Sequence, residues 1–146
     1  MQLVIISGRS GSGKSTALHQ LEDEGYYCID NLPVSLLPSL VAEAQREEFA
    51  HFHGTAVCID ARNAWKYLAD FGQVMDDLPA SVESEVVFLD AQESALIKRF
   101  SETRRKHPLT SDSMPLAEAI ARERELLEPI SSAATLVMDT SQMTIY

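Results

Sequence analysis

The sequence predicts an α/β domain, in which a central parallel sheet of about five strands lies between two layers of helices as a three-layer sandwich. Short apolar runs alternate along the chain with segments of helical periodicity, a pattern typical of strand–helix–strand units. A glycine-rich loop that starts at Gly8 joins the first apolar run to the first helical segment. The length of 146 residues is typical of one domain with one solid core.

The first half of the chain contains predicted strands at Leu3–Ser7, Tyr26–Ile29 and Thr55–Ile59. A helix over Ser15–Glu24 joins the first two strands, and Gly25 supplies its C-terminal stop. Pro33 and Pro38 do not fit one continuous helix, so we expect a turn there and a helix over Pro38–Phe49.

The second half begins with an amphipathic helix, because apolar residues recur every three or four positions from Ala64 to Leu78, after an N-cap at Asn63. The remaining elements are strands at Val86–Leu89 and Leu136–Met138, helices at Glu93–Lys106 and Pro115–Glu128, and a loop at His107–Ser113. The last helix is expected to end before Pro129.

A phosphate-binding motif follows the first strand. Its residues fit the G-x-x-x-x-G-K-[ST] (Walker A) pattern at every position: Gly8, Arg9, Ser10, Gly11, Ser12, Gly13, Lys14 and Ser15. The glycines allow positive φ angles, and the loop amides form an anion site with the start of the following helix. Lys14 is expected to contact the β- and γ-phosphates, and the Ser15 hydroxyl to bind Mg²⁺. The motif therefore predicts a P-loop that binds a nucleotide.

Aspartates follow four of the predicted strands, at Asp30, Asp60, Asp90 and Asp139. Ligands of parallel α/β sheets bind at the carboxyl ends of the strands, so all four carboxylates are expected on the P-loop side. A P-loop site needs one aspartate for Mg²⁺, although each of these residues also suits a turn or a helix cap. We expect Asp60 to serve the metal, with Asp30 as the second choice.

The net charge of −10 disfavours nucleic-acid binding unless basic residues are segregated. Five of the twelve lysines and arginines do lie together, as Lys98, Arg99, Arg104, Arg105 and Lys106. This stretch is either a solvated helix end or a lid in which Arg104 and Arg105 stabilise transition-state charge on the phosphates. Arg122 and Arg124 alternate with glutamates, and the Glu118–Arg122 spacing favours a salt-bridged surface.

Composition indicates a cytoplasmic protein. Cys28 and Cys58 lie in predicted strands without metal-ligand spacing, so reduced, buried thiols are expected. The chain contains no apolar run of the roughly 18 residues that a membrane span needs, and its first residues form a strand, not a signal peptide. Residues 140–144 offer capping residues for a further helix, so we expect residues 1–146 to be the N-terminal domain of a longer protein.

Six segments carry a more specific resemblance, and they run through essentially the whole chain: Val4–Ser15, Tyr27–Pro33, Leu36–Pro38, Asp60–Asn63, Arg104–Leu109 and Glu118–Ile120. They resemble the RapZ/YvcJ family of bacterial nucleotide-binding proteins, whose RapZ members act as RNase adapters. The first segment alone indicates only a P-loop. The Asp-Asn-Leu-Pro and Arg-Arg-Lys-His-Pro-Leu segments are far more specific.

The resemblance implies a fold like that of nucleoside-monophosphate or shikimate kinases, ATP at Gly8–Ser15 and weak ATP and GTP hydrolysis. It also implies homo-oligomers and, in RapZ-type members, a small regulatory RNA presented to RNase E to control glucosamine-6-phosphate synthase. The basic RNA-binding residues lie in a C-terminal half that this chain lacks, so RNA binding is not expected of these residues alone.

A guanine-nucleotide segment is implied at Asp60, Ala61, Arg62 and Asn63. This segment differs from the Asn-Lys-x-Asp pattern of true GTPases, so Asp60 suits Mg²⁺ as well as it suits a guanine base. Three functions stay open: a regulatory ATP- or GTP-binding domain, a small-molecule kinase with its acceptor near Asp30, and a P-loop for another anion such as an amino-sugar phosphate. No sequence feature marks an acceptor pocket, and the resemblance favours the first.

Overall fold

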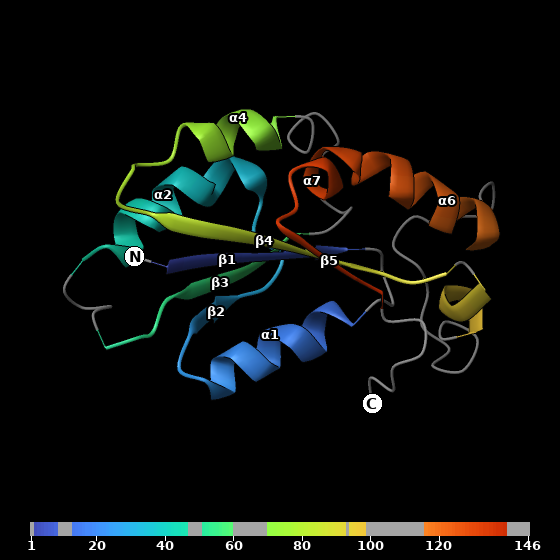
Figure 1. The fold of residues 1–146 in the computed structure, drawn as a ribbon, viewed down its shortest axis with the longest axis horizontal. Helices are drawn as coiled ribbons and strands as arrows, with labels where there is room; N and C mark the ends of the chain where they lie inside the picture. Colours follow the sequence, from blue (N-terminus) through green and yellow to red (C-terminus); the bar gives the residue numbers. More distant parts are fainter. Residues whose placement is uncertain are drawn as a thin grey trace.

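One sheet of five parallel strands organises the chain (Figure 1). The computed structural model describes residues 2–8, 13–46, 51–59, 70–92, 94–98 and 116–139. The strands are β1 (Gln2–Gly8), β2 (Tyr27–Ile29), β3 (Thr55–Ile59), β4 (Glu83–Asp90) and β5 (Leu136–Asp139). Their order, β2-β3-β1-β4-β5, places β1 at the centre. This confirms the predicted parallel α/β sheet.

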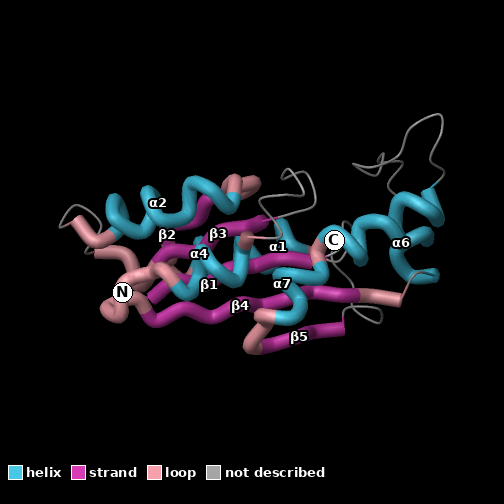
Figure 2. Tube along the Cα trace, turned by 90° about the horizontal axis from the view of Figure 1, so that it is seen from above, coloured by secondary structure: helices cyan, strands magenta, loops and turns pink. Residues whose placement is uncertain are grey.

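Helices cover both faces of the sheet (Figures 1 and 2). On one face, α1 (Lys14–Asp23) packs against β1, β2 and β3. The other face carries the 3₁₀ helix η1 (Val34–Leu36), α2 (Leu37–Ala44), α4 (Phe71–Asp76) and α7 (Glu128–Ser132). The longest described helix, α6 (Leu116–Leu126), extends past the carboxyl ends of the strands.

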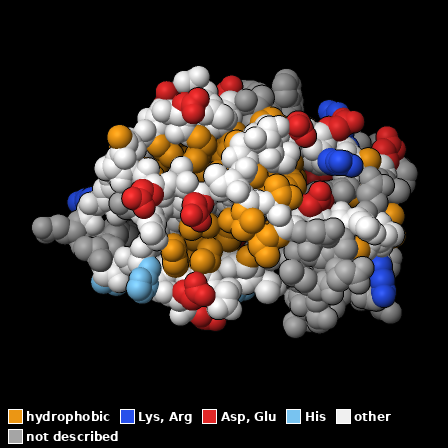
Figure 3. All heavy atoms as spheres, viewed as in Figure 1, with side chains coloured by type: hydrophobic (Ala, Val, Ile, Leu, Met, Phe, Trp, Pro, Cys, Tyr) orange, Lys and Arg blue, Asp and Glu red, His pale blue; other side chains and the backbone are white. Residues whose placement is uncertain are grey.

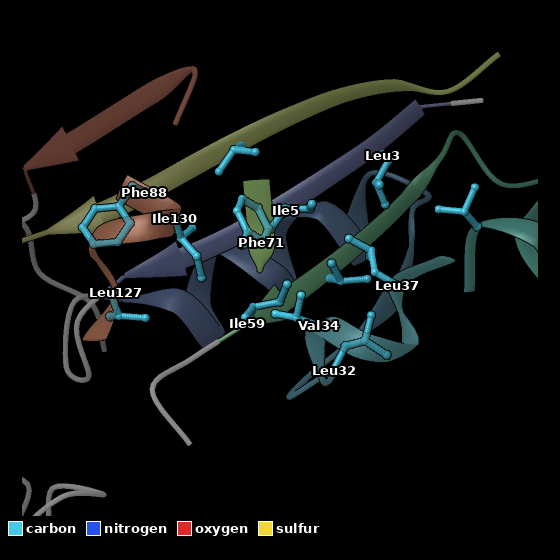
Figure 4. Close-up of a cluster of buried hydrophobic side chains, with 13 residues drawn as sticks. Leu3, Ile5, Leu32, Val34, Leu37, Ile59, Phe71, Phe88, Leu127 and Ile130 are labelled. Carbon is cyan, nitrogen blue, oxygen red and sulfur yellow. The ribbon is translucent and has the colours of Figure 1, made fainter. Parts of the chain in front are cut away.

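Two apolar clusters sit on the two faces of the sheet, because successive strand side chains point to opposite sides. The larger one joins Ile5 of β1 to Phe71 of α4 and Ile130 of α7 (Figure 4). The smaller one joins Ile6 of β1 to Leu18 of α1. Every residue of β3 is buried, as expected for an internal strand of a parallel sheet.

One helix end differs from the prediction. The helix expected over Pro38–Phe49 ends at Ala44, because residues 45–48 are all polar and offer no apolar face to bury. Helix α6 ends at Leu126, before Pro129 as predicted, but a further short helix, α7, follows it and carries that proline in its first turn. Proline is tolerated there because the first-turn amide has no partner within the helix. Of the helix predicted from Ala64 to Leu78, the described part is α4.

Strand β4 is longer than its apolar run predicts. It begins at Glu83 instead of Val86, and its first three residues are exposed yet paired with β1. On the outer side, β5 pairs with residues 87–90, so no described strand lies beside residues 83–85 of β4 there. Polar and charged residues are tolerated on such an edge, and an apolar pattern therefore misses them.

Both cysteines are free thiols in strands, Cys28 in β2 and Cys58 in β3, and the predicted burial holds for Cys58 only. Cys58 is buried and Cys28 is half-buried. Burial, and secondarily the negative charge of Glu22, raise the pKa of the Cys28 thiol above its usual value. Among the described helices, none combines the length and the apolar character that crossing a membrane requires.

Two glycines give a matched test of this fold. Gly25 ends α1 with φ +97°, and a Cβ there would lie 2.5 Å from Cδ2 of His53, whereas a Cβ at Gly72 in α4 would meet open space. We expect Gly25→Ala to lower the free energy of unfolding by about 1–2 kcal/mol. Gly72→Ala should raise it by about 0.5–1 kcal/mol, because alanine loses less entropy in a helix. Urea denaturation measures both, and a change of the same sign would contradict the structure.

Candidate functional site

The P-loop lies at the carboxyl end of the central strand. From β1 the chain leads to α1 on one face of the sheet, whereas from β3 it leads to α4 on the opposite face. Neighbouring strands whose connections diverge in this way leave a crevice at their carboxyl ends, where ligands of α/β sheets bind. Ser7 and Ile59 are paired in register, so the carboxyl ends of β1 and β3 border the position expected for a ligand.

The start of α1 is built for an anion. The residue at its N-cap, Gly13, has φ 104°, and Gly8 at the other end of the loop has φ 150°, which agrees with the predicted use of glycine. A glycine cap offers no side-chain acceptor, and the first turn of α1 contains no acidic residue. The first-turn amides, which have no acceptor within the helix, therefore carry the positive end of the helix dipole toward the loop.

Lys14 folds back over the loop that precedes it. Its Nζ donates a hydrogen bond of 2.9 Å to the Gly8 carbonyl oxygen, in a half-buried environment. This contact holds the ammonium group between the end of β1 and the start of α1. The ammonium group and the first-turn amides of α1 therefore lie near the same end of β1. Their role in phosphate binding stays a prediction.

Ser7 is a site residue that the sequence analysis missed. Its side chain is fully buried, and its Oγ donates a hydrogen bond of 2.6 Å to the Ile59 carbonyl oxygen. The bond ties the last residues of β1 and β3 together, directly before Gly8 and Asp60. A hydroxyl at the end of an otherwise apolar strand was the available signal.

The metal candidates share one sheet edge but differ in distance from the P-loop. Ser15 is exposed in the first turn of α1, and Asp30 is exposed directly after β2. Because β3 lies between β2 and β1, Asp30 follows a strand about 10 Å from β1. Asp60 follows the adjacent strand, β3, which favours it over Asp30. No cluster of three or more histidine, cysteine or acidic side chains among the described residues suits a metal ion.

Asp90 has the turn role that the sequence suggests for it, since its Oδ1 accepts a hydrogen bond of 2.8 Å from the Ala91 amide. The other predicted site residues lie outside the described residues: Arg9, Ser10, Gly11, Ser12, Asp60, Ala61, Arg62, Asn63, Arg104 and Arg105. Their roles stay predictions.

Helix α6 confirms the predicted salt-bridged surface in part. Arg122 is exposed and pairs with Glu125 at 2.9 Å, whereas the i,i+4 spacing pointed to Glu118. Glu123 is fully buried, although its alternation with arginines predicted a salt-bridged surface. It lies on the same helical stripe as the buried residues Ile120 and Leu127, and this period was the signal that the charge pattern obscured.

A P-loop between the central strand and the first helix of a parallel 2-3-1-4-5 sheet defines an α/β domain of the P-loop kinase type. The chain belongs to the family described as the RapZ-like N-terminal domain, which it matches over residues 1–146. The family match confirms the resemblance found in the sequence.

Curated relatives match the whole chain. A "Nucleotide-binding protein" of Hahella chejuensis is 54% identical over 147 residues, which cover 100% of this chain and 51% of the relative. A protein of the same name from Saccharophagus degradans is 52% identical, with the same coverage of both chains. The chain therefore spans about half the length of the curated relatives it matches.

Solved structures share the fold at low identity. A shikimate kinase from Bacteroides thetaiotaomicron has a TM-score of 0.57 at 16% identity, covering 97% of this chain and 88% of that chain. The YorR protein of Bacillus subtilis, in complex with phosphorylated GDP, has a TM-score of 0.60 at 20% identity, covering 98% and 88%. These similarities confirm the predicted kinase-like architecture.

Ser7→Ala tests whether the buried hydroxyl fixes the site. Without it, the Ile59 carbonyl loses a buried donor, and we expect the free energy of unfolding to fall by about 1–2 kcal/mol. Ser84→Ala is the matched control, because Ser84 is an exposed serine in β4, and its change should stay within about 0.5 kcal/mol. Equal effects in urea denaturation would contradict the assigned role of Ser7.

Proposed function

We propose that this chain is a regulatory nucleotide-binding domain that holds the polyphosphate of ATP or GTP at Gly8–Ser15. One observation carries the proposal. The Lys14 ammonium and the uncapped start of α1 converge at the carboxyl end of the central strand. The names of the curated relatives, and the nucleotide bound by the structurally similar YorR protein, support this function.

Binding of a polyphosphate exchanges one acceptor of Lys14 for another. In the structure, the ammonium group donates to the neutral carbonyl of Gly8. A phosphate oxygen carries full negative charge and forms the stronger, charge-assisted hydrogen bond, so it displaces the carbonyl. The amides from Arg9 to Gly13 would surround the same anion, and Gly13 has no side chain that would obstruct the approach to the start of α1.

Mg²⁺ fits the oxygen donors at this edge. The Ser15 hydroxyl would bind the ion beside the phosphates, and Asp60 would hold it from the neighbouring strand, with Asp30 as the alternative. Hydroxyl and carboxylate oxygens are the hard ligands that Mg²⁺ prefers. The ion neutralises phosphate charge when it is bound.

The family resemblance supports a weak ATPase or GTPase activity at this site. Lys14, Arg104 and Arg105 would stabilise the charge that develops during phosphoryl transfer. Residues 60–63 would contact the base, and in this way admit GTP beside ATP.

The adapter role belongs to the longer family members. We infer that the full-length protein is cytoplasmic, forms homo-oligomers, binds a small regulatory RNA and directs it to RNase E to control glucosamine-6-phosphate synthase. The family resemblance supports this role. The net charge of −10 argues that the RNA contacts lie outside residues 1–146.

A small-molecule kinase is the second candidate. The exposed carboxylate of Asp30 lies at the same sheet edge and would suit an acceptor hydroxyl as a base. A kinase would transfer the ATP γ-phosphate to one metabolite, whereas the regulatory domain would transfer it only slowly and only to water.

Lys14→Ala should abolish measurable affinity for Mg²⁺–ATP and Mg²⁺–GTP in isothermal titration calorimetry, because it removes the cation that neutralises the phosphates. The circular dichroism spectrum should stay unchanged. Arg46→Ala is the control, since it removes the same charge from an exposed ion pair with Glu43 at the end of α2. Unchanged affinity in Lys14→Ala would place the nucleotide elsewhere.

Arg104→Ala should lower the rate of ATP hydrolysis about 100-fold and change the Kd far less, because a lid arginine acts on transition-state charge. Arg122→Ala is the control, since Arg122 is exposed and paired with Glu125. Labelled ATP with a panel of metabolites measures both the rate and the product. Equal losses of ATP affinity and hydrolysis rate would mean that Arg104 already contacts the bound ATP in the ground state. Transfer to one metabolite at about 1–100 s⁻¹ would establish the kinase instead.

A further inference from the structure

Strand β5 exposes three successive apolar side chains. The exposed fractions are 51% for Leu136, 58% for Val137 and 36% for Met138. Because strand side chains alternate, Leu136 and Met138 lie on one face of the sheet and Val137 on the other. Among the described strands β5 pairs only with β4, so no described strand covers its outer edge. Figure 3 shows hydrophobic side chains gathered over this part of the molecule, with acidic side chains beside them.

The exposed strand is held firmly in place. The Thr135 amide donates to the Val86 carbonyl at 2.9 Å, and the Val86 amide donates to the Thr135 hydroxyl oxygen at 3.0 Å. The same hydroxyl donates to the Val86 carbonyl at 3.0 Å. Ile130 anchors α7, the preceding helix, in the larger apolar cluster. The open edge of β5 is therefore a preformed surface.

The first residues of the neighbouring strand, β4, have no described strand beside them on the side of β5, and they carry charged side chains. Glu83 and Glu85 are exposed there, and charged side chains discourage pairing with another strand. No charged residue occurs among residues 136–138 of β5. An open apolar edge is the template that strand addition requires.

We propose that β5 is the docking edge for the second half of the full-length protein, which adds a strand beside it. The relatives supply the occupant, because this chain covers 51% of their length and matches a family defined as an N-terminal domain. The added strand presents apolar side chains to Leu136, Val137 and Met138. Its flanks carry lysine or arginine, which complement the acidic surroundings of β5 and the net charge of −10.

Amide hydrogen exchange tests the proposal without a substitution. Two proteins are compared: residues 1–146 alone, and the same residues fused to the half of the Hahella chejuensis relative that this chain does not match. We expect the amides of residues 136–138 to exchange at least about tenfold more slowly in the fusion. Equal exchange in both proteins would overturn the proposal. Protection that appears in residues 1–146 alone and rises with concentration would assign the edge to a second copy instead.

A lysine placed on the edge of β5, and a lysine placed elsewhere on the surface, give a matched pair of variants. Val137→Lys in the fusion should remove the protection, whereas Leu36→Lys should leave it, because Leu36 is 50% exposed but lies in η1, away from β5. Val137→Thr keeps the β-branched shape and should retain strand β5 with partial protection. Full protection in Val137→Lys would overturn the proposal. Calorimetry with Mg²⁺–ATP on the same variants measures nucleotide affinity at the P-loop independently.

Discussion

The pairing of β1 on both sides constrains everything else in the site. Residues 3–7 are in register with β3, and residues 2–8 are in register with β4, so hydrogen-bonded neighbours hold β1 on both sides up to its carboxyl end. The buried bond from Ser7 to the Ile59 carbonyl fixes the last point before the loop. The direction of the chain at Gly8 is thereby set, and the start of α1 has to lie within reach of it. A phosphate site made of main-chain amides needs this rigidity, because amides cannot adjust as side chains do.

The two polar contacts at this point differ in kind. The Ser7 hydroxyl is buried and neutral, and breaking its bond would strand a carbonyl away from water. The Lys14 ammonium is only half-buried, and its bond to Gly8 joins a cation to a neutral acceptor that an anion readily replaces. One contact is therefore part of the scaffold, and the other is exchangeable. A binding site needs both, because the first keeps the loop in shape while the second changes partner.

Sequence reasoning succeeded where a structural requirement is local. Gly13 and Lys14 belong to a motif whose spacing predicts a helix start, and the structure shows it, with Gly13 at the N-cap and Lys14 as the first residue of α1. It failed where a distant neighbour decides. Glu83 is in a strand because β1 lies beside it. Glu123 is buried although its neighbours in the sequence are charged. The choice of the aspartate for Mg²⁺ depends on both kinds of information. The sequence offers Asp60 and Asp30, and the strand order, which is a property of the whole sheet, favours Asp60.

The parallel sheet also relates the two proposed surfaces. The pairing register places Gly8 beside Leu89, and Leu89 beside Met138, so the first residue of the P-loop and the exposed end of β5 lie in one row. Two strand spacings, about 10 Å, separate them. Because every strand runs in the same direction, the chain leaves β5 at the edge where the nucleotide is proposed to bind. A second half docked along β5 would therefore lie about two strand spacings from β1. Any rearrangement of the P-loop would reach it through two rigid, hydrogen-bonded strands, without a long relay of side chains.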